Sequence, residues 1–93
     1  MNVFIIVNKT LFNEQISKGF FKITPFIHSS TKEQLPKTIN KFKDSSEDLL
    51  IVEVKSTKAK WEPSKSRSND GLFAHFYDEI PKEDIVSISP FRN

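Results

Sequence analysis

The amino-acid sequence predicts an α+β fold, a single small domain over residues 1–93 with a twisted, mostly antiparallel sheet and two helices in its N-terminal part. Its length allows only one hydrophobic core. With nine phenylalanines and no cysteine, bulky aromatic side chains must fill this core without help from disulfides. Several apolar runs have the periodicity of strands, and two short segments between them have helical spacing. This pattern predicts the α+β class.

The N-terminal part begins with a strand and continues into a helix. The run Val3–Val7 is apolar and rich in β-branched residues, which favours a buried strand. Asn8 can cap the helix that follows, and Gly19 fits the left-handed position just after it. Between these two positions, one stripe of the helix is formed by Leu11, Phe12, Gln15 and Ile16.

A second helix is expected shortly after Ser30 and Thr31. Glu33 and Gln34 follow these two hydroxyl residues at a spacing of three, so a capping box can form in either register. Pro36 is tolerated only in the first turn of a helix. Two forms are therefore open: a short turn at residues 31–35, or a helix whose regular part spans residues 36–43.

The remaining apolar runs predict strands. Leu49–Val54 is apolar on both faces up to Glu53, as expected of the central strand of the sheet. Residues 55–70 are typical of a long exposed loop, with a strand fragment at Trp61. Pro81 fits the first turn of a brief helix. Further extended segments are expected at residues 20–23, 26–28, 72–77 and 85–89.

Two histidines and one glutamate are the candidates for catalysis. His28 and His75 each lie inside an aromatic, strand-like run, and an imidazole can change its protonation state near neutral pH. Glu62 follows the only tryptophan, where a carboxylate can act as an acid or orient an imidazole; a salt bridge to a nearby lysine is the ordinary alternative. We expect the three residues to meet at one cleft.

The candidate ligand-binding residues surround these three positions. The hydroxyl groups and backbone amides after His28 suit a phosphate or pyrophosphate at a strand-to-helix turn, although helix capping alone would also explain them. Strand alternation places Phe73, His75 and Tyr77 on one face, as an aromatic wall for ligand stacking or as ordinary core packing. The candidates are Ser29, Ser30, Thr31, Trp61, Phe73 and Tyr77.

Charge and spacing argue against several classes of function. The histidines and Glu62 match the composition of a mononuclear metal site, but no His-x-x-x-His or Glu-x-x-His spacing is present, so we expect no metal. A net charge of +2 does not argue for nucleic acid, and no apolar run approaches the ~20 residues that cross a membrane. We expect a cytoplasmic protein. The central loop can steer a phosphate-bearing ligand through Lys55, Lys58, Lys60, Lys65 and Arg67.

Short motifs follow one another along most of the chain. They are Phe26-Ile27-His28 with Ser30, Thr31 and Gln34, then Leu49–Val54, then Trp61-Glu62, and finally Phe73 with His75 and Tyr77. In these motifs the chain resembles the family of domain of unknown function 952. The resemblance runs from Phe26 to Pro90, with Ala74 where proline is usual and Asp78 where glycine is usual.

The resemblance implies a fold remotely similar to that of ADP-ribosyltransferase-like proteins, which split NAD in a cleft between two small sheets. It thus implies a small nucleotide-type ligand, NAD or a related nucleotide, in a cleft lined by His28, Ser30, His75 and Tyr77. As an enzyme, the domain would be a glycosyl- or phospho-transferase acting on NAD or nucleotides. Two alternatives are a non-enzymatic binding or interaction module, and a metal-dependent hydrolase that uses His28, Glu62 and His75.

Overall fold

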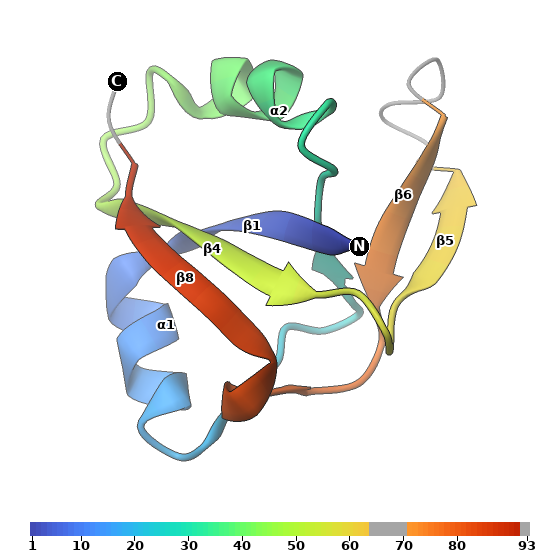
Figure 1. The fold of residues 1–93 in the computed structure, drawn as a ribbon. Helices are drawn as coiled ribbons and strands as arrows, with labels where there is room; N and C mark the ends of the chain where they lie inside the picture. The colour runs from blue at the N-terminus through green and yellow to red at the C-terminus, as the bar shows by residue number, and fades with distance from the viewer. Residues whose placement is uncertain (64–70, 92–93) are drawn as a thin grey trace.

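The central strand of the main sheet is β4 (Leu49–Lys55), as the sequence predicts (Figure 1). It pairs antiparallel with β1 (Asn2–Asn8) on one side and with β8 (Ile85–Pro90) on the other. The computed structural model describes residues 1–63 and 71–91. Its other elements are α1 (Lys9–Ile16), β2 (Phe20–Phe21), β3 (Ile27–His28), α2 (Leu35–Phe42), β5 (Lys60–Pro63), β6 (Leu72–Phe76), β7 (Ile80–Pro81) and the 3-10 helix η2 (Lys82–Asp84).

The expected class, a small α+β domain with two helices and antiparallel pairing, is confirmed, but the strands of the described residues form three sheets rather than one. Their orders are β1-β4-β8, β2-β7 and β3-β6-β5. Among the described residues, the chain after β3 pairs with β1 through a single isolated bridge between Phe4 and Ser30. At Thr31 the chain already enters the turn that leads to α2, so the two larger sheets cannot pair further.

The two faces of β1 serve different purposes. Val3, Ile5 and Val7 point into the hydrophobic core, which also contains apolar side chains of α1 and of the other two sheets. Phe4 and Ile6 point to the opposite side, toward α2. The two helices lie on opposite sides of the main sheet, as Figure 1 shows. Because side chains alternate along a strand, one face of β1 packs in the hydrophobic core and the other lines a pocket.

The first helix is capped as its sequence predicts. The Asn8 side-chain oxygen accepts a hydrogen bond from the backbone N–H of Leu11 at 3.0 Å. Gly19 has φ of 99°, a left-handed conformation that an L side chain rarely adopts. The chain can then reverse into β2, and Phe12 packs against Phe21 with ring centroids 5.4 Å apart.

The start of α2 combines the two forms that the sequence left open. Thr31 Oγ1 accepts from the Gln34 N–H and Gln34 Oε1 accepts from the Thr31 N–H, so the capping box uses this register and not that of Ser30 and Glu33. A turn thus precedes the regular helix, and Pro36 lies in its first turn. Gln34 also donates from Nε2 to the carbonyl of Leu72 at 2.8 Å, which ties α2 to β6.

Two predicted segments differ in extent. The extended run at residues 20–23 pairs only over β2, because its partner β7 is equally short and ends at Pro81. Pro81 itself precedes η2 as its cap, and the brief helix predicted there is a 3-10 turn. Within the long loop predicted at residues 55–70, Lys60–Pro63 forms β5 against β6; Lys65 and Arg67 lie outside the described residues.

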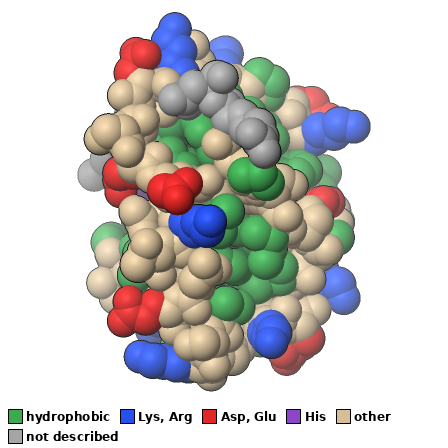
Figure 2. Space-filling model, turned by 90° about the vertical axis from the view of Figure 1, so that its left-hand side faces the viewer, with side chains coloured by type: hydrophobic (Ala, Val, Ile, Leu, Met, Phe, Trp, Pro, Cys, Tyr) green, Lys and Arg blue, Asp and Glu red, His purple; other side chains and the backbone are tan. Residues whose placement is uncertain are grey.

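The edge strand β8 exposes apolar side chains. Val86 and Ile88 are 48% and 52% exposed, although Ile88 pairs with Val52, which is 1% exposed. Figure 2 shows apolar side chains gathered on one face of the molecule. The hydrophobic core therefore covers β4 but leaves these two side chains of the edge strand β8 partly exposed to solvent. Neither α1 nor α2, the two α-helices of the described residues, has the length and apolar content needed to cross a membrane.

Candidate functional site

Strand pairing in the sheet β3-β6-β5 brings the two histidines together. β3 and β6 are antiparallel, and His28 is the direct cross-strand partner of His75. Their ring centroids are 5.1 Å apart and the ring planes are nearly perpendicular, at 84°. His28 is exposed, whereas His75 is 2% exposed. One imidazole can therefore meet a ligand, and the other lies directly behind it.

Glu62 of β5 completes the group from the other side of β6. Its Oε1 lies 2.8 Å from Nδ1 of His75, and it also accepts a hydrogen bond from the Tyr77 hydroxyl. Glu62 can reach both because strand alternation places Phe73, His75 and Tyr77 on one face of the chain, as predicted. We call Glu62 and His75 the dyad.

Electrostatics favour a charged carboxylate at Glu62. The hydrogen bond from Tyr77 and then that from His75 lower the pKa of Glu62 below its ordinary value of 4.5, whereas partial burial opposes this; nearby Lys60 lowers it slightly further. The same bond raises the pKa of Tyr77 above its ordinary 10.0, since it favours the protonated phenol. At neutral pH the group therefore contains a carboxylate and a neutral phenol.

A carboxylate on Nδ1 fixes the protons of a neutral His75. Because a carboxylate can only accept, Nδ1 must carry the proton, and Nε2 is left as an acceptor. That Nε2 atom is buried and has no hydrogen-bond partner among the described residues. An unsatisfied buried polar group costs about 1 to 3 kcal/mol, so its presence needs an explanation.

Phe26 covers this arrangement. Its ring centroid lies 4.5 Å from that of His75, 4.6 Å from His28 and 5.2 Å from Tyr77. Phe26 lies two residues before His28, so the alternation of an extended chain places both side chains on one side, but Phe26 was not among the predicted site residues. The ring shields the inner imidazole from water and strengthens electrostatic interactions there.

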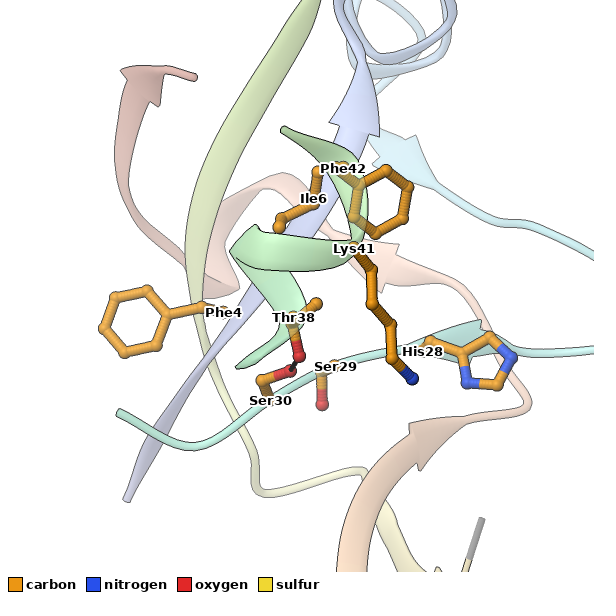
Figure 3. Close-up of a pocket in the computed structure, with 8 residues that line it drawn as sticks. All are labelled: Phe4, Ile6, His28, Ser29, Ser30, Thr38, Lys41 and Phe42. Carbon is orange, nitrogen blue, oxygen red and sulfur yellow. Dashed lines mark hydrogen bonds between the residues drawn. The ribbon is translucent and has the colours of Figure 1, made fainter. Parts of the chain in front are cut away.

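A pocket of about 190 Å³ opens on the other side of His28 (Figure 3). It lies between β1, the segment that follows β3, and α2. The close-up shows the Lys41 side chain extending toward the space between Ser29 and His28, with the Phe42 ring above it. The lining is completed by Phe4, Ile6, Ser30 and Thr38.

The hydroxyl groups in this region already have protein partners. Ser29 donates to the carbonyl of Ala74, Ser30 pairs with Thr38 at 2.7 Å between hydroxyl oxygens, and Thr31 caps α2. These bonds join β3, β6 and α2 to one another. Their first role is therefore to build the pocket, although Ser29 and Ser30 also line it.

The predicted site residues consequently fall into two groups that share His28. Ser29 and Ser30 line the pocket, whereas Glu62, His75 and Tyr77 lie behind it. Three candidates belong to neither group. Trp61 is 37% exposed and pairs with Ala74, so it does not share the face of Glu62; Phe73 is buried; Thr31 caps the helix.

Sequence reasoning missed Lys41, Thr38, Phe42, Phe4 and Ile6. For Thr38 and Lys41 the available signal was their spacing of three on α2, which places them on one helix face. For Phe4 and Ile6 it was their alternation against the buried residues of β1. Neither signal shows that the helix face and the strand face meet, because this depends on where α2 packs.

The geometry gives little support to the metal-dependent hydrolase. Over the described ranges, no three His, Cys, Asp or Glu side chains gather in a way that could hold a metal ion. Glu62 approaches Nδ1 of His75, and a ligand set that includes His28 would need this bond to be rearranged. Carboxylate orientation of an imidazole explains the same residues without a metal.

Most residues of this site lie within a part of the chain that matches a known protein family. A sequence profile of the family described as "Protein of unknown function (DUF952)" matches residues 13–88. The chain belongs to this family. Among solved structures, protein CC0527 of Caulobacter crescentus is similar to this DUF952 chain, with a TM-score of 0.81 and 21% identity over 97% of this chain and 85% of CC0527. A double mutant of CC0527 gives the same values.

At this identity the likeness shows the fold alone. No curated protein matches the chain significantly. The membership in the DUF952 family that the motifs implied is confirmed, and its description assigns no activity. The link to ADP-ribosyltransferase-like proteins stays a prediction.

Proposed function

We propose that this DUF952 domain binds a small phosphorylated, nucleotide-type ligand in the pocket formed by β1, the segment after β3, and α2. The observation that carries the proposal is the placement of the Lys41 ammonium and the His28 imidazole at one pocket that also has apolar walls. An ammonium group binds phosphate as a compact charge, and an imidazole can add a hydrogen bond.

The charge of Lys41 is available to such a ligand. Among the described residues it has no ion-pair partner. The hydroxyl oxygens of Ser29 and Ser30 add polar atoms to the same pocket, although each is engaged with the protein. A phosphate that enters there would replace water around the ammonium by a charge-assisted contact, which contributes about 1.5 to 3 kcal/mol.

Apolar walls suit the remainder of a nucleotide. Phe42, Phe4 and Ile6 form these walls, and aromatic or aliphatic side chains pack well against a ribose or a base. The volume of about 190 Å³ is below the roughly 300 to 1,000 Å³ of pockets that enclose a drug-sized ligand. We therefore favour a mononucleotide or a sugar phosphate as the ligand. Of the larger NAD or ADP-ribose molecule, only about one half would fit inside the pocket.

The predicted link to ADP-ribosyltransferase-like proteins guides the choice of probes. Inorganic phosphate, AMP, ADP-ribose and NAD would be added to the protein at millimolar concentration, with adenosine as the ligand that lacks phosphate. A ligand that binds only the folded state raises the free energy of unfolding, by about 2.7 kcal/mol at 100 times its dissociation constant. We expect the phosphorylated compounds to raise Tm and adenosine to have a much smaller effect.

A matched pair of lysine variants tests the site itself. Lys41→Gln removes the pocket ammonium, whereas Lys43→Gln removes an exposed charge just beyond the end of the same helix. We expect Lys41→Gln to weaken AMP binding about tenfold, measured by calorimetric titration, and Lys43→Gln to leave it nearly unchanged. No Tm increase with any phosphorylated probe, or equal effects of both variants, would refute the proposal and favour the non-enzymatic interaction module.

A further inference from the structure

We propose that the Glu62–His75 dyad exchanges a proton with His28, so that His28 acts as general base and acid toward a hydroxyl group or water at the ligand. This inference rests on the proposed function, since it assigns chemistry to the ligand of that pocket. In this scheme His28 touches the ligand, and Glu62 and His75 are positioning residues that act through it.

The first support is the nitrogen of His75 that carries the proton. Glu62 holds Nδ1 at 2.8 Å and keeps its negative charge, because its pKa is lowered by its hydrogen bonds. A neutral His75 therefore carries its proton on Nδ1 and presents a lone pair at Nε2. If Nε2 gains a second proton, the imidazolium lies next to a carboxylate, which stabilises it.

The second support is the buried Nε2 atom itself. It has no partner within the described part of the chain, although His75 is 2% exposed. A purely structural residue at this position would be apolar or fully hydrogen-bonded, since an unsatisfied acceptor is unfavourable by about 1 to 3 kcal/mol. Because no protein donor occupies this lone pair, Nε2 can accept a proton from a group that reaches it.

The third support is the position of His28. Its ring lies edge to face with His75 at 5.1 Å, and it also lines the pocket. His28 is thus the side chain that both the dyad and a ligand can reach. Phe26 packs on both imidazoles and limits the access of water to the contact between them.

The proposed relay consists of two coupled proton transfers. A ligand hydroxyl or a water molecule gives its proton to one nitrogen of neutral His28. When the His28 ring turns so that its other N–H meets Nε2 of His75, His28 gives that proton to Nε2, and His75 becomes an imidazolium beside Glu62. The oxygen gains nucleophilic character, His28 is neutral again, and the reverse transfers deliver the proton to a leaving group. Only O–H and N–H bonds change in these steps.

Other charged or titratable groups face this arrangement. Lys60 is the cross-strand partner of His75 on β5, and its Nζ lies 5.9 Å from the centroid of the Tyr77 ring. Tyr77 donates to Glu62, and Lys41 lines the pocket beside His28. Of the two cations, Lys60 favours an ionised Glu62, which suits a relay that passes the proton inward to His75.

The first experiment observes the tautomer of His75. Since the chain has two histidines, long-range ¹H–¹⁵N spectra of the imidazoles can be assigned with His28→Gln. At about pH 8, where an ordinary imidazole is neutral, we expect the proton of His75 on Nδ1. A His75 that carries its proton on Nε2 would overturn the inference.

The second experiment measures the reactivity of His28. Diethyl pyrocarbonate acylates one nitrogen of a neutral imidazole while the other nitrogen releases its proton, so an acceptor at His75 should accelerate the reaction. We expect Glu62→Gln to slow acylation of His28 about tenfold, the effect of one pKa unit, as followed by peptide mass spectrometry. Glu62→Asp, which keeps a carboxylate, should recover part of the rate.

Controls separate this inference from the proposed function. Glu14→Gln removes an exposed carboxylate on α1 and should leave the His28 rate unchanged. Equal rates in the parent protein and a folded Glu62→Gln variant would overturn the relay, even if AMP binds as proposed. Conversely, the expected tautomer and rates without any binding of phosphorylated probes would overturn the proposed function and, with it, the assignment of the relay to a phosphorylated ligand.

Discussion

Two central strands, β4 and β6, show how the same position in a sheet can serve stability or chemistry. Each lies in the middle of a three-stranded antiparallel sheet. The buried residues of β4 are all apolar, and its one acidic residue, Glu53, binds Asn2 and Ser87 at the periphery. In β6, by contrast, buried His75 binds Glu62 and keeps an unsatisfied nitrogen.

The difference shows where polar groups inside this small protein need a functional explanation. A buried apolar side chain contributes to the free energy of folding in proportion to the area removed from water. A buried imidazole with one unsatisfied nitrogen opposes that contribution. The placement of His75 in a strand that could hold a phenylalanine or leucine therefore favours a role in the site over a role in stability.

The largest expected effect tests the stability side of the comparison. Val52→Ala should lower the free energy of unfolding by about 2 to 4 kcal/mol, because it leaves a cavity beneath β4. Chemical denaturation measures the change. Ile88→Ala alters the exposed cross-strand partner of Val52 and should have an effect below about 1 kcal/mol. Equal losses in both variants would show that β8 belongs to the core.

A smaller effect is expected when the polar residue of β6 is replaced. His75→Leu should change the free energy of unfolding by less than about 1 kcal/mol, because the lost bond to Glu62 is offset by removal of the unsatisfied Nε2. Glu62 still accepts from Tyr77 in this variant. A loss as large as that of Val52→Ala would contradict the comparison, since the imidazole would then be a main source of stability.

The smallest effect concerns pH. Glu62 has a lowered pKa in the folded protein, so it stabilises the fold above its ordinary pKa of 4.5, and this contribution is lost as the pH falls through the lowered value. Glu62→Gln should therefore remove part of the decline in Tm below pH 4.5, while Glu14→Gln should leave that decline unchanged. An identical acid profile in Glu62→Gln and the parent protein would show that Glu62 contributes nothing to it.

Much of the fold was predictable because its signals are local. The cap at Asn8, the glycine at position 19 and the apolar run of β4 depend on residues close in sequence, and each has the predicted role. The capping box was also visible, but the choice of Thr31 and Gln34 over the alternative register required the structure. Local sequence could not decide it, since both registers offer suitable side chains.

The candidate site was only partly predictable for the same reason. The aromatic and polar character of His28, Glu62, His75 and Tyr77 made them candidates, and the structure brings these four together. It separates them from Trp61 and adds Lys41, whose spacing from Thr38 indicates a shared helix face but not what that face meets. Contacts between distant segments depend on packing, which a spacing of residues within one segment does not specify.

The sequence by itself determined the central strand, the cap at Asn8 and the alternation that places His75 and Tyr77 on one face of the chain. These follow from backbone geometry, which acts over a few residues. Only the tertiary structure decided that His28 pairs with His75, that Glu62 reaches Nδ1, and that α2 brings Lys41 to the pocket. Strand register and helix packing depend on how the whole core fills its volume, so these contacts arise only when the chain folds.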